Sequence, residues 1–517
     1  MIYSASIIIP VYNSETTLQK CAESILFGSV PNVRIILVDD CSTDGSWDLC
    51  RKLSEENENV CAVRNEVNSG VSFTRNHGLS LAEGKYVLFV DSDDWVSGRY
   101  AGKLIGAAER YPDSLPVCGF RFLDYLHGQK QDYVWNRNGE NEYELTEKQL
   151  FALLDRVHLQ QIWNKAFRRE IIEKNHLRFD ETQSMGEDFQ FVLDYLECSG
   201  IRDLRVLNEP LYFYTRSKAT SLMSGFGKQD EELEYKRFRK VLALAGEDDP
   251  DCVRQYKTAI AKTKKNNVYR TVLDKSRNKK EKLALIEKIM GDGRAEEHYR
   301  REAAVLHKGR AKDVAKAVRQ VFSWIQGRIG QLRLRRTVAS VKKQLQGGTY
   351  SILSQNCIGG VVYHDLGQQF LSPTINLYFR SPDFVRFVLN LDHYLKADLR
   401  MTWGEEYPVG YLDDIPVFFQ HYDLCSEAKE KWEERKQRLD PDKIAVFCTD
   451  RDGFTEETYT QWLRIPYPKL LFSATFRKDP NVLFFPEYTH DGMVGDLIPK
   501  REFYAEGRLT GVLKRVR

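Results

Sequence analysis

The feature that most constrains the fold is the alternation of short apolar runs with helical segments over the first 225 residues. The runs are rich in β-branched residues and read "SASIIIPVYN", "VRIILVDD", "VCAVRNE" and "YVLFVDSDD". Helices are expected between them, for instance over 15–27 and 71–82. Strands that are apolar along their whole length are typical of a parallel sheet covered by helices on both faces. The sequence therefore predicts an α/β domain, in which ligands bind at the carboxyl ends of the strands.

Acidic side chains stand where two of these strands end. Asp39 and Asp40 close one run, and Asp91, Asp93 and Asp94 close another within "YVLFVDSDDW". A single aspartate in such a place commonly caps a turn or a helix. Three carboxylates within four positions repel one another, however, and a hard cation such as Mg²⁺ or Mn²⁺ relieves that repulsion. We therefore expect a metal site at this edge, with open positions that phosphate oxygens fill.

Composition excludes several classes of protein. The 517 residues exceed what one core usually supports, so two or three domains are expected. The 76 basic and 74 acidic side chains leave a net charge of only +2, which argues against a globally basic nucleic-acid binder. Ten scattered cysteines without a CxxC pair favour a reducing compartment. With no signal-peptide pattern and no apolar run of ~18 residues, we expect a cytoplasmic protein whose membrane contact, if any, is peripheral, at the inner face of the plasma membrane.

Five ordered motifs resemble the family 2 glycosyltransferases of the GT-A fold over about residues 4–225. They are "SIIIPVYN", "ILVDDCSTDGS", "NSGVSFTRN", "YVLFVDSDDW" and "GEDFQF". The resemblance implies a Rossmann-like nucleotide-binding domain, a nucleotide-diphosphate sugar as donor with UDP as its nucleotide, and Mn²⁺ or Mg²⁺ held by the DxD aspartates. In that family Asp93 would be the principal metal ligand, with Asp91 beside it.

The resemblance also implies a set of donor-binding residues. Three would line the base pocket, Asp40 would accept a hydrogen bond from the base, and the others would lie toward the ribose and the diphosphate. The set is Pro10, Val11, Tyr12, Asp40, Asn68, Arg75, Asp91, Ser92 and Arg216. A cation at Arg216 would stabilise the charge of the leaving nucleotide, although a solvated loop arginine is an equal alternative.

Transfer to a hydroxyl also requires a base on the acceptor side. The segment "SMGEDFQF" offers Glu187 and Asp188 at the start of a helix, where acids are also common because of the helix dipole. The resemblance implies that Asp188 is the base, that Glu187 orients the acceptor, and that the reaction inverts the anomeric centre. It also places Asp94 on the acceptor side and makes Trp163, Asn164 and Lys165 the floor of the acceptor site.

Residues 226–347 change character, and we expect a helical, basic connecting region there. Between 303 and 347 eleven lysines and arginines stand against the single acid Asp313. Apolar residues recur at three- and four-residue steps over 314–332, so a helix there would carry one apolar stripe. Such a helix either lies on an anionic membrane or packs against protein, and the sequence leaves both open.

A second, smaller α/β domain is expected over 348–517, after Gly347-Gly348. Motifs such as "SQNCIGG" and "SPDFVRF" resemble an uncharacterised domain of bacterial exopolysaccharide biosynthesis proteins, over about 350–495. Its candidate site residues are Asn356, Cys357, His364 and His421, although buried thiols and satisfied polar residues would explain each one. The domain would be a second transferase, which would make the chain bifunctional, a phosphate-handling module or an acceptor-binding module.

Two functions remain open at this stage. The first is a metal-dependent, inverting transfer of a hexosyl or N-acetylhexosaminyl group from a UDP-sugar to a hydroxyl of a capsule or exopolysaccharide acceptor, which could be lipid-linked. The alternative is a non-catalytic scaffold of a surface-polysaccharide assembly complex. The intact "DSDD" and "GED" segments favour the enzyme.

Overall fold

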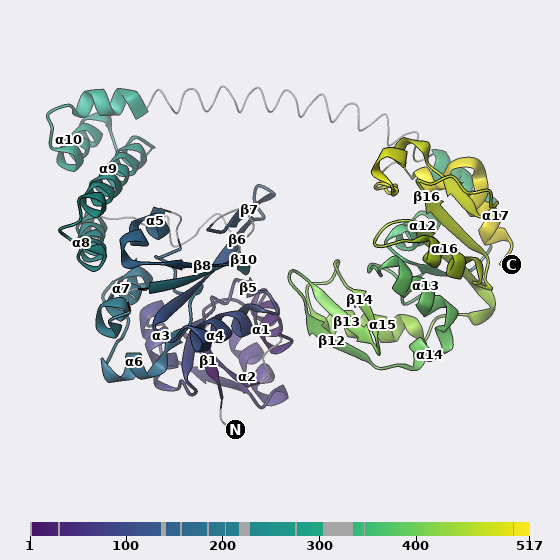
Figure 1. The fold of residues 1–517 in the computed structure, drawn as a ribbon, viewed down its shortest axis with the longest axis horizontal. Helices are drawn as coiled ribbons and strands as arrows, with labels where there is room; N and C mark the ends of the chain where they lie inside the picture. The colour runs from purple at the N-terminus through teal and green to yellow at the C-terminus, as the bar shows by residue number, and fades with distance from the viewer. Residues whose placement is uncertain are drawn as a thin grey trace. The chain divides into compact units, whose positions relative to one another are not determined.

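A computed structural model of the chain forms two compact units, Met1–Lys316 and Ala317–Arg517. Figure 1 shows them along the chain from purple to yellow. The structure describes residues 3–28, 32–135, 141–155, 158–183, 186–201, 203–216, 228–273, 277–302, 334, 336–345, 347–499 and 501–516. Each unit has its own sheets and its own buried core.

The predicted parallel sheet is present in the first unit. Its strand order is β3-β2-β1-β4-β9, and all neighbours pair in parallel except the short β9. The strands are β1 (Ala5–Val11), β2 (Val33–Asp39), β3 (Val60–Arg64), β4 (Tyr86–Phe89) and β9 (Phe167–Arg168). Strand order reverses between β1 and β4, because β2 and β3 extend to one side of β1 and β4 lies on the other. A ligand of this sheet is therefore expected beyond the carboxyl ends of β1 and β4.

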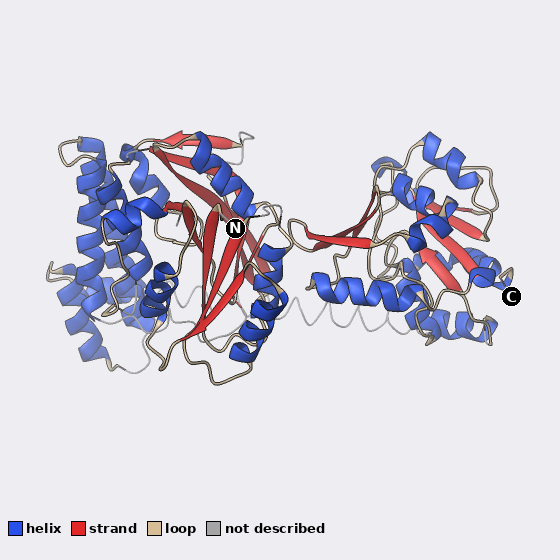
Figure 2. Ribbon diagram, turned by 90° about the horizontal axis from the view of Figure 1, so that it is seen from below, coloured by secondary structure: helices blue, strands red, loops and turns tan. Residues whose placement is uncertain are grey.

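Helices connect and cover these strands, as Figure 2 shows in blue. They are α1 (Leu18–Leu26), α2 (Ser46–Glu56), α3 (Val71–Ser80) and α4 (Tyr100–Arg110), followed later by α5 (Leu150–Asp155), α6 (Arg169–Lys174) and α7 (Glu187–Ser199). The first unit also contains a second sheet, in which the strand order is β5-β10-β6-β7 and β8 pairs with β10. Its strands are β5 (Trp95–Val96), β6 (Ser114–Asp124), β7 (Gln129–Tyr133), β8 (Glu142–Leu145) and β10 (Asp203–Arg216).

The first unit extends beyond residue 225, which corrects the predicted domain boundary. Helices α8 (Lys228–Ala245) and α9 (Pro250–Leu273) follow, and α10 (Lys279–Met290) packs on α9. Phe238, Val241 and Ala245 of α8 and Cys252 of α9 belong to the same buried core as the parallel sheet. The apolar face of α8 therefore packs into the core of the first unit. This helix is part of that unit and not a separate connecting segment.

The predicted basic helix lies mostly outside the described residues, since 303–333 are not described. Residues 336–344 are helical, and Val341 and Leu345 belong to the buried core of the second unit. The Gly347-Gly348 pair therefore lies within that unit and does not mark its start. Within the described part of the chain, no helix combines the length and the apolar character that crossing a bilayer requires.

The second unit is a smaller α/β fold, as predicted. Four parallel strands are ordered β11-β15-β16-β17: β11 (Ser351–Ser354), β15 (Ile444–Thr449), β16 (Lys469–Ser473) and β17 (Val482–Phe484). An antiparallel sheet consists of β12 (Leu399–Trp403), β13 (Pro408–Leu412) and β14 (Ile415–Phe418). The helices are α12 (Ile358–Leu366), α13 (Ser381–Leu389), α14 (Leu391–Lys396), α15 (Cys425–Lys436), α16 (Glu456–Leu463) and α17 (Arg508–Lys514).

Candidate active site

The "DSDD" segment turns sharply just after β4, at the point where strand order reverses. The amide of Asp94 donates to the carbonyl of Asp91 (3.0 Å), which closes the turn. Asp94 itself is buried, with only 2% of its surface exposed. Its carboxylate accepts hydrogen bonds from the hydroxyl of Tyr212 and the amide of Thr215, both at 2.7 Å. Burial, together with the charges of Asp93 and Asp91, raises the pKa of Asp94 well above its usual value. The expected acceptor-side residue is thus an internal anchor to β10.

Asp93 and Asp91 lie closer to solvent. Asp93 is exposed, and the Asp91 side chain is partly exposed while its Oδ1 pairs with Nη2 of Arg75 at 3.0 Å. Oxygen donors of this kind suit Mg²⁺ or Mn²⁺. Among the described residues, no group of three or more His, Cys, Asp or Glu side chains is arranged to hold a metal ion. These two carboxylates fit a cation that takes its other ligands from a bound diphosphate and water, and they do not form a closed cage.

A buried arginine connects this turn to the predicted base. Arg75, on α3, contacts Asp188 at 2.6 Å and Glu187 at 3.2 Å through Nη1, and Asp91 at 3.0 Å through Nη2. Its guanidinium also lies 5.4 Å from the ring centre of Phe179. Burial opposes its charge, but the three carboxylates outweigh that effect and raise the pKa of Arg75. Three carboxylates, one from the turn after β4 and two from the start of α7, thus surround the guanidinium of Arg75.

The surroundings of Asp188, the expected base, shift its pKa. Burial raises the pKa of Asp188 to about 7; Arg75 opposes this change, whereas Glu187 and Asp91 add to it. A carboxylate with a pKa near the working pH accepts a proton and releases it again readily. Asp188 and Glu187 begin α7, after Gly186 in the left-handed conformation with φ at 77°.

Asp40 was expected to accept a hydrogen bond from the base of the donor, whereas in the structure its carboxylate is bonded to groups of the protein itself. Asp40 is buried, and its oxygens accept hydrogen bonds from the side chain of Asn65 (2.8 Å) and the amides of Ser69 (2.9 Å) and Gly70 (2.8 Å). The carboxylate therefore shapes the "NSG" turn before α3, and its bond to a base remains a prediction. Asn68 is exposed in that same turn.

The other donor-side residues lie around the ends of β1 and β10. Pro10 and Val11 are buried in β1, whereas Tyr12 follows it with 48% of its surface exposed. The hydroxyl of Ser92 lies 2.8 Å from that of Ser14, which joins the β4 turn to the segment after β1. Arg216 ends β10 and is exposed, with Nη1 at 3.7 Å from Asp124.

Comparisons with known proteins show which families the two parts of the chain resemble. Residues 6–175 match the model of glycosyl transferase family 2, and residues 330–510 match a domain of unknown function, DUF1919. A Haemophilus influenzae protein described as uncharacterized is 34% identical over 161 residues, which cover 31% of this chain and 78% of that protein. Residues 6–175 belong to glycosyltransferase family 2.

Other relatives of this glycosyltransferase match it over shorter parts of their own length. Glycosyltransferase GlyA of Streptococcus pneumoniae is 34% identical over 194 residues, covering 35% of this chain and 26% of GlyA. Minor teichoic acid biosynthesis protein GgaB of Bacillus subtilis is 29% identical over 224 residues, covering 43% of this chain and 24% of GgaB. The structure of S. aureus TarS 1–349 in complex with UDP-GlcNAc aligns with a TM-score of 0.39 and 20% identity, over 56% of this chain and 72% of that one.

The predicted acceptor floor of the glycosyltransferase lies inside the protein. Trp163 is 2% exposed and stacks on Tyr212, with ring centres 4.0 Å apart. Asn164 is fully buried and donates to the carbonyls of Cys118 and His158, both at 3.2 Å. These side chains therefore have almost no surface to offer an acceptor, so their burial does not favour the expected role as its floor.

Sequence reasoning missed Tyr212, which holds the glycosyltransferase site together, and assigned Lys165 only to the acceptor floor. The hydroxyl of Tyr212 donates to Asp94 and accepts from the amide of Asp91 (3.1 Å), so it fixes both ends of the turn. Lys165 is buried, and its Nζ donates to the carbonyl of His158 and the side chain of Asn164, both at 2.7 Å. Burial lowers the pKa of Lys165 to about 7, against the charges of Cys118 and Asp188. The motifs "LYFYTR" and "WNK" contain these residues, but nothing in their spacing indicates their partners.

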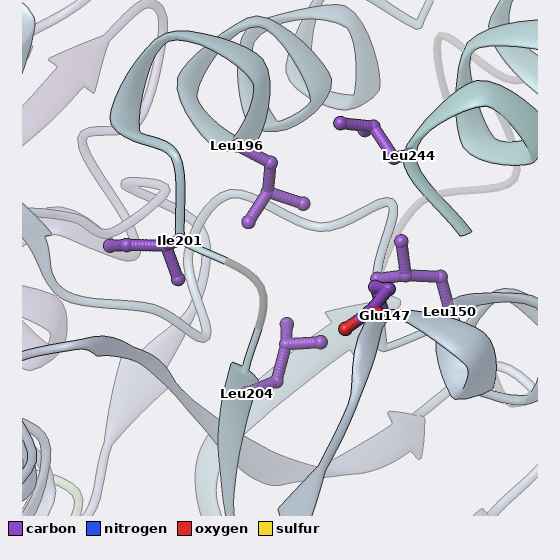
Figure 3. A pocket seen from close by; sticks show the side chains of 6 residues that line it. All are labelled: Glu147, Leu150, Leu196, Ile201, Leu204 and Leu244. Atoms are coloured by element: carbon purple, nitrogen blue, oxygen red, sulfur yellow. The ribbon is translucent and has the colours of Figure 1, made fainter. Parts of the chain in front are cut away.

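A small pocket of the glycosyltransferase unit lies elsewhere. Figure 3 shows its lining, which is apolar except for one glutamate: Glu147, Leu150, Leu196, Ile201, Leu204 and Leu244. None of the predicted site residues lines it.

In the DUF1919 region the structure brings two of the four candidates into contact. The Sγ of Cys357 lies 2.9 Å from Nε2 of His421. Asn356 stands next to Cys357 and donates to Thr449 Oγ1 at 3.4 Å. His364 is in the last turn of α12, has 84% of its side chain exposed, and lies 3.7 Å from Asp365. Of the two candidate histidines, His421 is therefore the one in contact with Cys357.

Proposed function

We propose that the first unit transfers a sugar from a nucleoside-diphosphate sugar, with UDP as the nucleotide, to a hydroxyl of a bacterial surface polysaccharide. The observation that carries the proposal is the meeting of Asp91, Glu187 and Asp188 around Arg75 at the switch point of the sheet. In this proposal Asp91 would bind the metal, Arg75 would stabilise the phosphates and Asp188 would be the base, all within one site. The relatives named GlyA and GgaB support a sugar transfer in cell-surface polymer synthesis.

The residues divide the reaction between a donor side and an acceptor side. The acceptor oxygen attacks the anomeric carbon while the bond from that carbon to the diphosphate oxygen breaks, which inverts the centre. Asp188 takes the proton of the acceptor hydroxyl. Arg75 contacts both Asp91 and Asp188, and its charge would stabilise the diphosphate as it leaves. Asp93 and Asp91 would hold Mn²⁺ or Mg²⁺, which supplies further charge neutralisation to the diphosphate.

Substitution of the base tests the proposal. Asp188→Asn should lower kcat by ~10²-fold or more, the usual scale for loss of a general base, while the Kd for the donor changes little. The donor is found beforehand by thermal stabilisation with a panel of UDP-sugars, since a ligand of the folded state raises its melting temperature. Asp194→Asn is the matched control, because Asp194 is on the same helix but pairs with Lys240. An Asp188→Asn enzyme with unchanged kcat would refute the assignment.

The acceptor and the site of action extend the same proposal. A lipid-linked acceptor would make membrane contact useful, and the basic, apolar-striped segment 303–347 would provide it. Cosedimentation of the whole chain with anionic vesicles should then exceed that with neutral vesicles and weaken as salt is added. Equal sedimentation with both vesicle types would remove the membrane from the proposal.

A further inference from the structure

The Cys357–His421 pair lies at the carboxyl edge of the parallel sheet in the second unit. Cys357 follows β11 and precedes α12, so its backbone begins the helix. His421 comes from the segment after β14, 64 residues further along the chain. Their 2.9 Å contact joins a thiol to an imidazole nitrogen. The carboxyl ends of parallel strands are where α/β folds bind ligands, so this pair is well placed for chemistry.

The surroundings hold the thiol in a fixed position. The side chain of Asn356 accepts from the amide of Ile358 (3.2 Å) and donates to Thr449 at the end of β15 (3.4 Å). Thr449 in turn donates through its amide and hydroxyl to the buried Gln355, at 2.7 and 2.9 Å. The ends of β11 and β15 are thus linked around the first turn of α12.

The charges nearby distinguish between classes of substrate. Burial raises the pKa of the Cys357 thiol, and the negative charge of Asp496 adds to the rise, whereas Gln420 lowers it. The thiol is therefore neutral and needs a base before it attacks. A negative charge beside it also disfavours a phosphate or a sulfate. The two glycines of "CIGG" do not offer an anion cradle either, because they are buried at the start of α12, where a Cβ on Gly359 would come within 2.6 Å of Ser354.

We propose that Cys357 and His421 are the nucleophile and general base of an acyl-transfer site whose donor is a carboxylic ester or thioester. Gln420 supplies a neutral donor, since its Nε2 lies 3.7 Å from the Sγ of Cys357 and 3.4 Å from Nε2 of His421. A side-chain amide beside the nucleophile suits the oxyanion of a tetrahedral intermediate. The roles follow from this geometry, since such constellations recur on unrelated folds.

The steps balance without an oxidant or a reductant. His421 takes the proton of the thiol, the sulfur bonds to the acyl carbon, and the carbonyl oxygen becomes an oxyanion. The carbonyl re-forms, the bond to the alcohol or thiol leaving group breaks, and His421 returns the proton to that group. A saccharide hydroxyl or water then loses its proton to His421, attacks the thioester carbon and takes the acyl group, while the sulfur regains the proton.

Acylation of the full chain by p-nitrophenyl acetate tests the proposal. We expect a burst of p-nitrophenol and an intact-protein mass higher by one acetyl group, which peptide mapping assigns to Cys357. Cys357→Ala should remove that adduct. His421→Gln should keep the fold, because His421 is exposed, but slow acylation by ~10²-fold or more and flatten its pH dependence.

Controls separate this site from indiscriminate acylation. Cys198→Ala removes an exposed cysteine of the first unit and should leave the burst unchanged. Circular dichroism of each variant checks that the fold is retained. Absence of the adduct on the unsubstituted protein overturns the proposal, as does an adduct that survives Cys357→Ala or forms at the same rate in His421→Gln. Donor-sugar turnover is measured in parallel, so that failure here is distinct from failure of the glycosyl-transfer proposal.

Discussion

Asp93 and Asp94 are adjacent residues with opposite surroundings. Asp93 is exposed at the edge of the sheet, whereas Asp94 is buried and bonded to Tyr212 and Thr215. Asp93→Asn should therefore abolish Mn²⁺-dependent donor turnover with an unchanged melting temperature. Asp94→Asn should lower stability by about 1–3 kcal/mol, the usual cost of disturbing a buried hydrogen-bonded group. Turnover assays with metal titration and thermal unfolding measure both; turnover of Asp93→Asn equal to that of the unsubstituted protein would contradict a metal role.

Asp188 should make activity depend on pH. Its pKa of about 7 means that the free enzyme holds a proton on the base below that pH. The value of kcat/KM should therefore rise with pH up to about 7 and then level off. A profile that is flat between pH 5 and 8 would show that Asp188 does not titrate in the working enzyme.

Asp188 should also make the stability of the fold depend on pH. Here the direction is opposite to that of activity, because stability should fall as pH rises. Since its pKa rises from the ordinary 3.8 to about 7 on folding, the folded protein binds a proton that the unfolded chain has lost between these values. Stability contributed by this group is thus present at low pH and is lost as pH rises through that window. Asp188→Asn should be more stable than the unsubstituted protein at pH 8 and gain less at pH 4. Denaturant unfolding at both pH values measures the difference, and an equal gain at both would refute it.

At the scale of elements, α8 supports the start of α7. Both ends of α7 have a glycine with positive φ, Gly186 at 77° and Gly200 at 67°. A Cβ on Gly186 would lie 2.2 Å from Nη1 of the buried Arg237 of α8, while nothing lies within 4 Å of one on Gly200. Arg237 also donates to Gln183, just before the base segment.

The two glycines therefore form a matched pair of substitutions. Gly200→Ala should cost about 1–2 kcal/mol, the penalty of the left-handed conformation alone. Gly186→Ala should cost more than that and also lower kcat, because Arg237 must move beside the Asp188 segment. Denaturant unfolding and turnover measure the two effects, and adding Arg237→Ala should relieve the extra cost. Equal losses from both glycine substitutions would show that α8 does not position this loop.

At the scale of the whole molecule, each unit should fold as a fragment of its own. The boundaries of these fragments should differ from those that the sequence patterns predict. A fragment of residues 1–302 retains α8 and α9, whereas 1–225 loses Phe238, Val241, Ala245 and Cys252 from the core. Burial of each large apolar side chain contributes about 1.5–3 kcal/mol, so 1–225 should be insoluble or unfold at a much lower temperature. The fragment 1–302 should fold and keep donor hydrolysis. Solubility, melting temperature and hydrolysis measure this, and a stable 1–225 would contradict the extended core.

The second unit allows the corresponding comparison. A fragment of residues 334–517 keeps Val341 and Leu345 in its core, and one of residues 348–517 does not. The longer fragment should therefore melt at the higher temperature. Equal melting temperatures would mean that the helix over 336–344 adds nothing to this unit.

The sequence alone determined the elements of this protein and the edge at which its chemistry gathers. Apolar, β-branched runs predict buried parallel strands, and acids directly after them must lie at the carboxyl edge, because both inferences depend only on local pattern. The tertiary structure decided which acids face solvent and which are internal. Arg75 meets Asp188 across 113 positions, and Cys357 meets His421 across 64. Pairings at such distances along the chain, like the packing of α8 that extends the first unit, depend on how whole elements fold together, and no local pattern encodes them.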